Sequence, residues 1–179
     1  IPMTLSTTAS SDASPDSDQA TGDVLVLPVA WRSGLPFAWL GSASILAGGV
    51  VAAVSRPTGF EQGPWVAAFL VLVAGVAQLS LGVGQAAMAS ASPTPLVVIA
   101  ELALWNLGCV LTIVGTLAAA PVLTTIGGVA VIAALVVFLW SVLTNGSAGG
   151  WLRIGYLTVL WFVLASTPVG LLLAWLRHS

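Results

Sequence analysis

Four polar side chains are the main candidates for chemistry in this sequence: Gln78, Gln85, Glu101 and Asn106. Each of them interrupts a long apolar run, and Glu101 is the only acidic residue after Glu61. An ionisable side chain inside a membrane suggests a functional site by default, here a proton relay, a cation site or a quinone contact. The structural alternative, which we favour, is that Glu101 lies near the headgroup boundary and pairs with Gln85 or with a neighbouring subunit.

The spacing of these residues predicts how they meet. Gln78 and Gln85 are seven residues apart, which places them within about 20° of each other on one helical face. If the chain reverses near Ser92, Gln85 reaches the depth of Glu101, and Gln78 reaches the depth of Asn106. This geometry predicts a hydrogen bond between Gln85 and Glu101, because polar groups without partners are costly in hydrocarbon.

The other reactive residue types are too few to form a catalytic centre. His178 is the only histidine and stands next to the C-terminus, so paired haem ligands, His-based zinc sites and a Ser-His-Asp triad have no candidates. Cys109 is the only cysteine and lies in an apolar run, which is typical of a small buried residue. We therefore expect no catalytic residues and no haem, metal or other cofactor bound by this chain alone.

The composition predicts the elements that must position these side chains. The chain has 179 residues, of which 58% are hydrophobic and 6% charged, whereas soluble domains carry about 25% charged residues. About 20 apolar residues suffice to cross a hydrocarbon core of about 30 Å as a helix. We expect an all-α integral membrane protein, a five-helix transmembrane bundle, with spans at about 35–54, 65–89, 96–119, 122–143 and 151–176.

The boundary between the third and fourth spans is the least marked. Between Pro95 and Leu143 the only charged residue is Glu101, yet one helix of that length would exceed about two hydrocarbon cores. The chain must therefore reverse, and Ala120-Pro121 is the expected place, because proline lacks a donor and disfavours a helical residue before it. Five spans put the termini on opposite faces, while the four arginines divide two against two and leave the orientation open.

Small residues recur at four-residue spacing along several spans. Such ridges let helix backbones approach closely in lipid, where dispersion and hydrogen bonding hold helices together. We therefore expect close packing at these positions: Ser44, Gly48, Ala74, Gly82, Ala86, Gly108, Thr112, Gly115 and Ala119.

The N-terminal region, residues 1–34, differs in composition from the rest. It holds four of the six acidic residues and is rich in Ser, Thr and Ala, which predicts disorder in isolation. Its one apolar stretch ends at Trp31, and this stretch is the part able to bury side chains against a partner. The expected docking residues are Val24, Leu25, Val26, Leu27 and Trp31.

These features favour one class of function over two others. We expect a non-catalytic accessory or structural subunit of a larger bacterial membrane complex, and among such complexes a respiratory electron-transfer assembly. The alternative is a carrier or channel for ions or small solutes centred on Glu101, and a membrane enzyme ranks last. The expected partners are other integral membrane subunits and lipids in the bacterial inner membrane. Nucleic acid is excluded because the chain has no lysine and no cluster of arginines.

Overall fold

The computed structural model describes residues 31–88, 93–145 and 150–176. These residues form five long helices and no strand. The first is α1 (Trp31–Thr58), and the second is one continuous rod made of α2 (Gly63–Phe69), a π-helical segment η1 (Leu70–Ala77) and α3 (Gln78–Met88). The others are α4 (Pro95–Leu117), α5 (Pro121–Asn145) and α6 (Trp151–Leu176).

Four of these helices are long and apolar enough to cross a membrane. They comprise residues Trp31–Thr58, Gly63–Met88, Pro95–Leu117 and Pro121–Thr144, with lengths of 28, 26, 23 and 24 residues. At a rise of about 1.5 Å per residue, each is longer than a hydrocarbon core of about 30 Å. Helix α6 is of similar length, with 26 residues.

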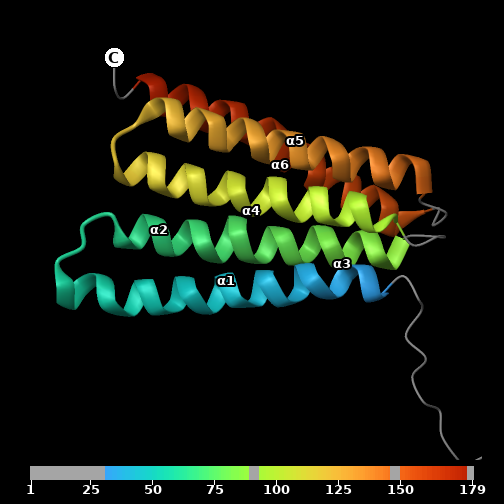
Figure 1. Ribbon diagram of the computed structural model, residues 1–179, viewed down its shortest axis with the longest axis horizontal. Coiled ribbons are helices and arrows are strands. Elements are labelled where there is room, and N and C mark those ends of the chain that lie inside the picture. The colour runs from blue at the N-terminus through green and yellow to red at the C-terminus, as the bar shows by residue number, and fades with distance from the viewer. Residues whose placement is uncertain (1–30, 89–92, 146–149, 177–179) are drawn as a thin grey trace, which may run out of the picture.

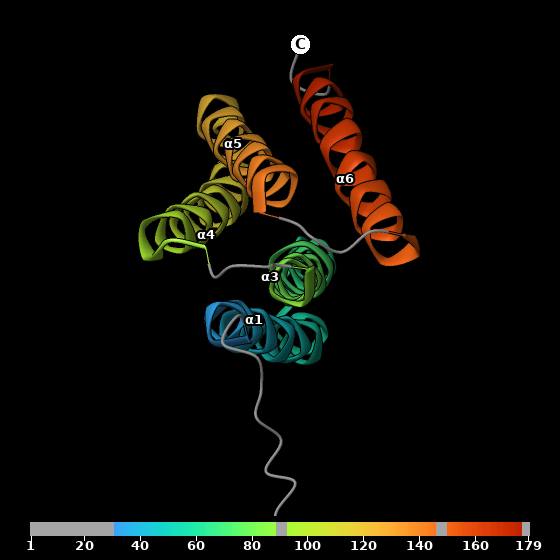
Figure 2. The same ribbon diagram turned by 90° about the vertical axis from the view of Figure 1, so that its right-hand side faces the viewer.

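Successive helices run in opposite directions along the bundle (Figure 1). The beginning of α1 therefore lies at one end of the bundle and the end of α6 at the other. Viewed from one end, α3 lies in the middle, with α1 on one side of it and α4, α5 and α6 arranged around its other side (Figure 2). The closest pairs are α1 with the α2–η1–α3 rod and α4 with α5. The fold thus consists of two helical hairpins and a fifth helix beside them.

The helix boundaries differ from the expected ones mainly at the first helix. It begins at Trp31 and ends at Thr58, whereas we expected residues 35–54, so Trp31 belongs to a helix and not to the polar tail. Pro36 and Pro57 lie inside it. Pro36 lies in the second turn and Pro57 in the last turn, so each removes one backbone hydrogen bond close to an end of the helix.

The expected reversal at Ala120-Pro121 is confirmed, and its backbone geometry occurs twice in the chain. After α4, Ala119 has a φ of 51°, its N–H donates to the Thr116 carbonyl at 3.3 Å, and the Ala120 N–H donates to the Gly115 carbonyl at 2.8 Å. After α1, Gly59 has a φ of 68°. Its N–H donates to the Arg56 carbonyl at 3.3 Å, and the Phe60 N–H donates to the Ser55 carbonyl at 3.0 Å. Both are Schellman motifs, which end helices by pairing their last carbonyls.

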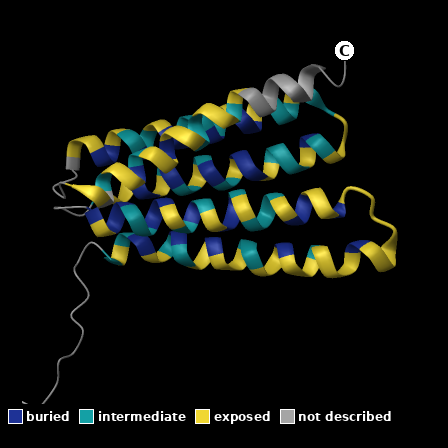
Figure 3. Cartoon of the chain, turned by 180° about the vertical axis from the view of Figure 1, so that it is seen from behind, coloured by how far each residue is buried: buried dark blue, intermediate teal, exposed yellow. Residues whose placement is uncertain are grey.

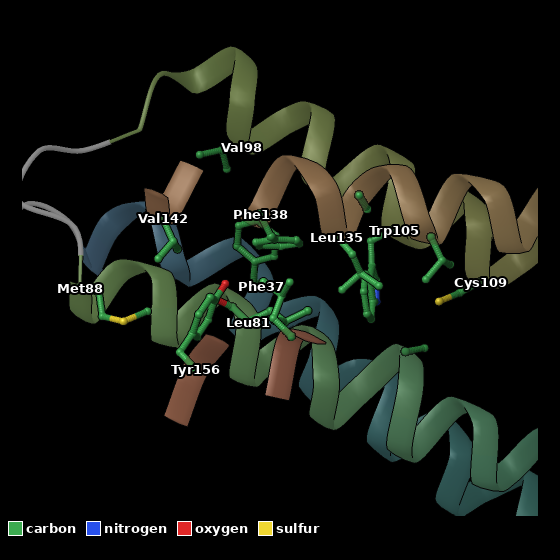
Figure 4. Close-up of a cluster of buried hydrophobic side chains, with 14 residues drawn as sticks. Phe37, Leu81, Met88, Val98, Trp105, Cys109, Leu135, Phe138, Val142 and Tyr156 are labelled. Carbon is green, nitrogen blue, oxygen red and sulfur yellow. The ribbon is translucent and has the colours of Figure 1, made fainter. Parts of the chain in front are cut away.

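The core is built by side chains from all five helices (Figure 4). Phe138 of α5 lies at its centre, with its ring 5.5 Å from that of Phe37 on α1 and 6.4 Å, edge to face, from that of Trp105 on α4. Leu81 of α3 and Leu160 of α6 are also almost fully buried. Aromatic rings at these distances attract one another through their quadrupoles in addition to dispersion.

Glycines allow the closest backbone approaches within each hairpin. A Cβ on Gly127 of α5 would lie 2.6 Å from the Thr112 backbone nitrogen and 2.7 Å from the Gly108 carbonyl of α4. In the other hairpin, a Cβ on Gly41 would lie 2.9 Å from the Gly75 carbonyl, and one on Gly48 would lie 2.9 Å from the Ala67 carbonyl. The expected close packing is confirmed at Gly48, Gly108 and Gly115. Ala119 is an exception, because it serves the turn after α4.

The exposed residues lie on the outward faces of the helices (Figure 3), and many of them are large and apolar. Large exposed side chains occur on every long helix, among them Trp39, Leu72, Leu96, Val122 and Phe162. In water such a surface would be an extensive hydrophobic patch. It is the surface expected of helices that face lipid or other membrane helices.

Candidate functional site

The carboxyl group of Glu101 is enclosed by the bundle. Glu101 stands on the inner face of α4 with 0% of its surface exposed, and Gln85 of α3 is 5% exposed. The Gln85 side-chain amide donates a hydrogen bond of 3.1 Å from Nε2 to Oε1 of Glu101. The bond that the sequence predicted between these two residues is therefore present.

The same amide also contacts a third helix. Gln85 Nε2 donates a second hydrogen bond, of 2.6 Å, to Oγ of Ser141 on α5, which is buried as well. An amide nitrogen carries two hydrogens, so this group can make both bonds at once. We call Gln85, Glu101 and Ser141 the polar junction. It joins α3, α4 and α5.

A fourth buried polar side chain comes from α6 and also contacts α3. Tyr156 is buried and its hydroxyl donates a hydrogen bond of 3.3 Å to the Leu81 backbone carbonyl. A Cβ on Gly84 would lie 2.7 Å from the Tyr156 ring, so the absence of a side chain there makes room for the ring. Tyr156 thus attaches α6 to α3 next to the polar junction.

The π-helical segment determines which way the α3 side chains point. In a π-helix each backbone hydrogen bond spans one more residue than in an α-helix, so the side chains after such a segment are rotated relative to those of an uninterrupted α-helix. Segment η1 ends at Ala77, directly before Gln78. After it, Gly82 faces Phe37 of α1 while Gln85 faces α4 and α5. The segment therefore determines the direction in which the side chains of Gln78 and Gln85 point.

Gln78 is buried without a hydrogen bond. It has 0% of its surface exposed, and neither its Nε2 nor its Oε1 has a partner among the described residues. The same holds for Oε2 of Glu101 and for the indole Nε1 of Trp105, which is also fully buried. Polar groups left in this state are uncommon and each one requires an explanation.

The remaining predicted residues do not join this site. Asn106 is half-buried, and its Nδ2 donates to the Leu102 carbonyl of its own helix at 2.8 Å, so it forms no bond with Gln78. Among the expected docking residues, Trp31 is the first residue of α1. The other four, Val24, Leu25, Val26 and Leu27, lie outside the described residues.

Sequence reasoning missed three residues of the site: Ser141, Tyr156 and Trp105. Ser141 and Tyr156 are two of several scattered polar residues in largely apolar helices, where they resemble ordinary packing positions. Trp105 had a signal, because it is a deep tryptophan four residues after Glu101 and therefore on the same helical face.

The arrangement offers hydrogen-bond donors and acceptors but, within the part of the chain that the structure describes, no group of three or more His, Cys, Asp or Glu residues suited to a metal ion. Function therefore has to be argued from the polar junction and its surroundings. Comparisons of the chain with protein-family models, with curated proteins and with solved structures find no match.

Proposed function

We propose that this protein is a non-catalytic, multi-pass subunit of a larger membrane assembly. The observation that carries the proposal is the enclosure of Glu101, whose carboxyl group bonds to Gln85 within the chain's own bundle. A carboxyl group that moves ions has to be reached from at least one side of the membrane. Here the group serves to connect helices of one chain.

The outer surface supports the same proposal. Exposed aromatic and aliphatic side chains cover each long helix, so the faces left over after the bundle has formed suit lipid chains and other membrane helices. The loops whose ends are described are short, since only a few residues separate α1 from α2 and α4 from α5. Among the described residues, most of the surface that could recognise a partner therefore lies on the helices.

Among such assemblies we choose a respiratory electron-transfer complex of a bacterial inner membrane, with helix α6 as the fifth span. Complexes of that kind commonly include small additional membrane subunits. In this proposal the redox cofactors belong to neighbouring subunits, and this chain contributes helices that fix their relative positions.

The test is purification at native expression level. A tagged full-length chain is extracted in a mild detergent and analysed by native electrophoresis, absorption spectroscopy and mass spectrometry. We expect the chain in a stoichiometric complex with other integral membrane proteins that carry haem or iron–sulfur absorption. Recovery of the chain alone or only with itself, under conditions in which known respiratory complexes stay intact, would contradict the proposal.

A second candidate function is a carrier or channel centred on Glu101. The unpartnered polar atoms beside Glu101 favour it, since they could contact a passing ion or solute. Reconstituted vesicles containing the purified chain distinguish the two functions. An ion or proton flux that the chain produces and that Glu101→Gln abolishes would replace the subunit proposal with the carrier, whereas flux equal to that of empty vesicles supports the subunit.

A further inference from the structure

Four buried polar atoms in the bundle interior have no partner among the described residues. They are the two amide atoms of Gln78, Oε2 of Glu101 and Nε1 of Trp105, and all three residues have 0% of their surface exposed. Leaving such a group unsatisfied costs about 1 to 3 kcal/mol. In a membrane the cost is higher, because no solvent is present nearby to replace the missing bond.

The three residues lie on helix faces that are turned toward the bundle interior. Trp105 follows Glu101 by one helical turn and therefore points the same way from α4. Gln78 lies between Ala74 and Leu81 along its rod, and both of these belong to the same buried cluster as Trp105. Figure 4 shows the Trp105 ring directed toward the rod that carries Leu81, with Leu135 next to it.

Their depths form a series that starts at the polar junction. From Glu101 to Trp105 the helix rises about 6 Å, and from Gln85 to Gln78 about 10 Å. The polar junction lies near the end of the bundle where α3 ends and α4 begins (Figure 1). Gln78, about 15 Å from the end of α3, is close to the middle of a hydrocarbon core of about 30 Å.

The chemistry of the four atoms selects the occupant. The Trp105 indole only donates hydrogen bonds, the Gln78 amide both donates and accepts, and Oε2 of Glu101 can accept. A metal cation would find no ligand in the Trp105 N–H, and an anion would be repelled by a carboxylate at Glu101. Water donates two hydrogen bonds and accepts two, and a buried water typically makes about three bonds to groups of this kind.

We propose that water molecules occupy the interior between Glu101, Trp105 and Gln78 and bridge their unpartnered atoms. The protein then contains an internal hydrated site that extends from the polar junction to the middle of the membrane. It lies within an otherwise apolar core, next to Phe138 and Leu135. The site is independent of any partner subunit, because all of its groups come from this chain.

The test is water-edited solid-state NMR on the full-length chain in lipid bilayers, which measures how fast magnetisation passes from water to a given proton. We expect the Trp105 indole N–H, identified by its loss in Trp105→Phe, to receive water magnetisation at a rate similar to that of the exposed Trp151. The Leu135 methyl groups should lag behind both. The Gln78 side-chain amide should behave like Trp105.

Two variants sharpen the experiment. Gln78→Leu removes one bridging group and should slow the build-up at Trp105 several-fold. The matched control, Asn106→Leu, removes an amide that already has a partner in its own helix and should leave the build-up unchanged. A Trp105 build-up as slow as that of Leu135 in the wild-type protein, or one that Gln78→Leu leaves unaltered, would overturn the proposal. If Gln78→Leu does not assemble, the wild-type measurement on Trp105 and Gln78 decides alone.

Discussion

Gln85 of α3 and Glu101 of α4 are joined by a hydrogen bond of 3.1 Å across a sequence separation of 16 residues. The bond connects the two hairpins, since α3 packs mainly against α1 and α4 mainly against α5. Backbone approach holds each hairpin together, whereas side chains hold the hairpins to one another. The polar junction is therefore the specific connection between the two hairpins. The rings of Phe37, Phe138 and Trp105 add apolar contacts between them.

Removing the Gln85 amide should loosen this connection. In Gln85→Leu both Glu101 and Ser141 lose their partner while remaining buried, which should lower the free energy of unfolding by about 1 to 3 kcal/mol. Glu101→Gln keeps an acceptor oxygen for Gln85 and should lose less. Reversible unfolding in mixed micelles with increasing denaturing detergent measures both changes.

The control for this pair is Thr158→Val. Thr158 is exposed and its hydroxyl bonds only to the Ile154 carbonyl of its own helix at 2.8 Å. Its replacement should change the stability by less than about 0.5 kcal/mol. A Gln85→Leu protein as stable as Thr158→Val would show that the polar junction does not hold the hairpins together.

The bond between Gln85 and Glu101 was predictable because it depends on depth. Antiparallel neighbours joined by a short turn bring residues equally far from that turn to the same level, and helical period then fixes the face. Ser141 was not predictable in this way, since its contact depends on how α5 crosses α3. The register of Gln78 was also out of reach, because it depends on the π-helical segment, for which the apolar sequence LVLVAGVA provides no marker.

The helix boundaries were likewise predictable from the sequence only in part. The reversal at Ala120-Pro121 follows from the chemistry of proline and from bilayer thickness. The four additional residues at the start of α1 could not be predicted from the sequence, because Arg32 and Ser33 are polar and Gly34 disfavours a helix. A Cβ on Gly34 would lie 3.0 Å from that of Ala86 on α3. The start of α1 therefore contacts the neighbouring rod, and no local sequence pattern predicts this contact.

The two Schellman motifs predict a stabilising substitution. Gly59 and Ala119 occupy the same position in equivalent turns, at φ values of 68° and 51°. Only Ala119 carries a Cβ, which a left-handed conformation disfavours by roughly 1 kcal/mol or more. Ala119→Gly should therefore raise the free energy of unfolding by about 0.5 to 1 kcal/mol, as the same unfolding experiment would show.

The neighbouring residue supplies the control for this substitution. Ala118 has a φ of −85° and has no need of glycine. Ala118→Gly should therefore stabilise nothing, and Ala119→Val should destabilise, because a β-branched side chain is still less tolerated at positive φ. A gain from Ala118→Gly equal to that from Ala119→Gly would contradict the assignment of strain to Ala119.

The contact between α4 and α5 predicts a contrast between two glycines. Gly127→Ala would place a methyl group 2.6 Å from the Thr112 backbone nitrogen, where no flexible side chain can move away, so the two helices must separate. Overpacking of this kind costs about 1 to 3 kcal/mol. Gly155→Ala on α6 meets nothing within 4 Å and should be neutral or stabilising by up to about 1 kcal/mol. Equal effects of both substitutions on thermal unfolding would show that α4 and α5 are less closely packed than described.

The last prediction concerns topology, and it tests whether α6 crosses the membrane as the fifth span. The helices alternate in direction, so each connection lies at the opposite end of the bundle from the previous one (Figure 1). Reporter fusions after Thr94 and Gly150 should therefore report the same compartment as a reporter at Ser11. Fusions after Glu61, Ala120 and Ser179 should report the other compartment. The series needs no assumption about absolute orientation, which the evenly divided arginines leave open, because each fusion is compared with the others.

The decisive comparison is between Gly150 and Ser179, since only α6 lies between them. Opposite compartments follow if its 26 residues span the hydrocarbon. If both reporters report the same side while the four earlier positions alternate, α6 lies along the membrane surface or against the bundle without crossing, and the chain has four spans with both termini on one face.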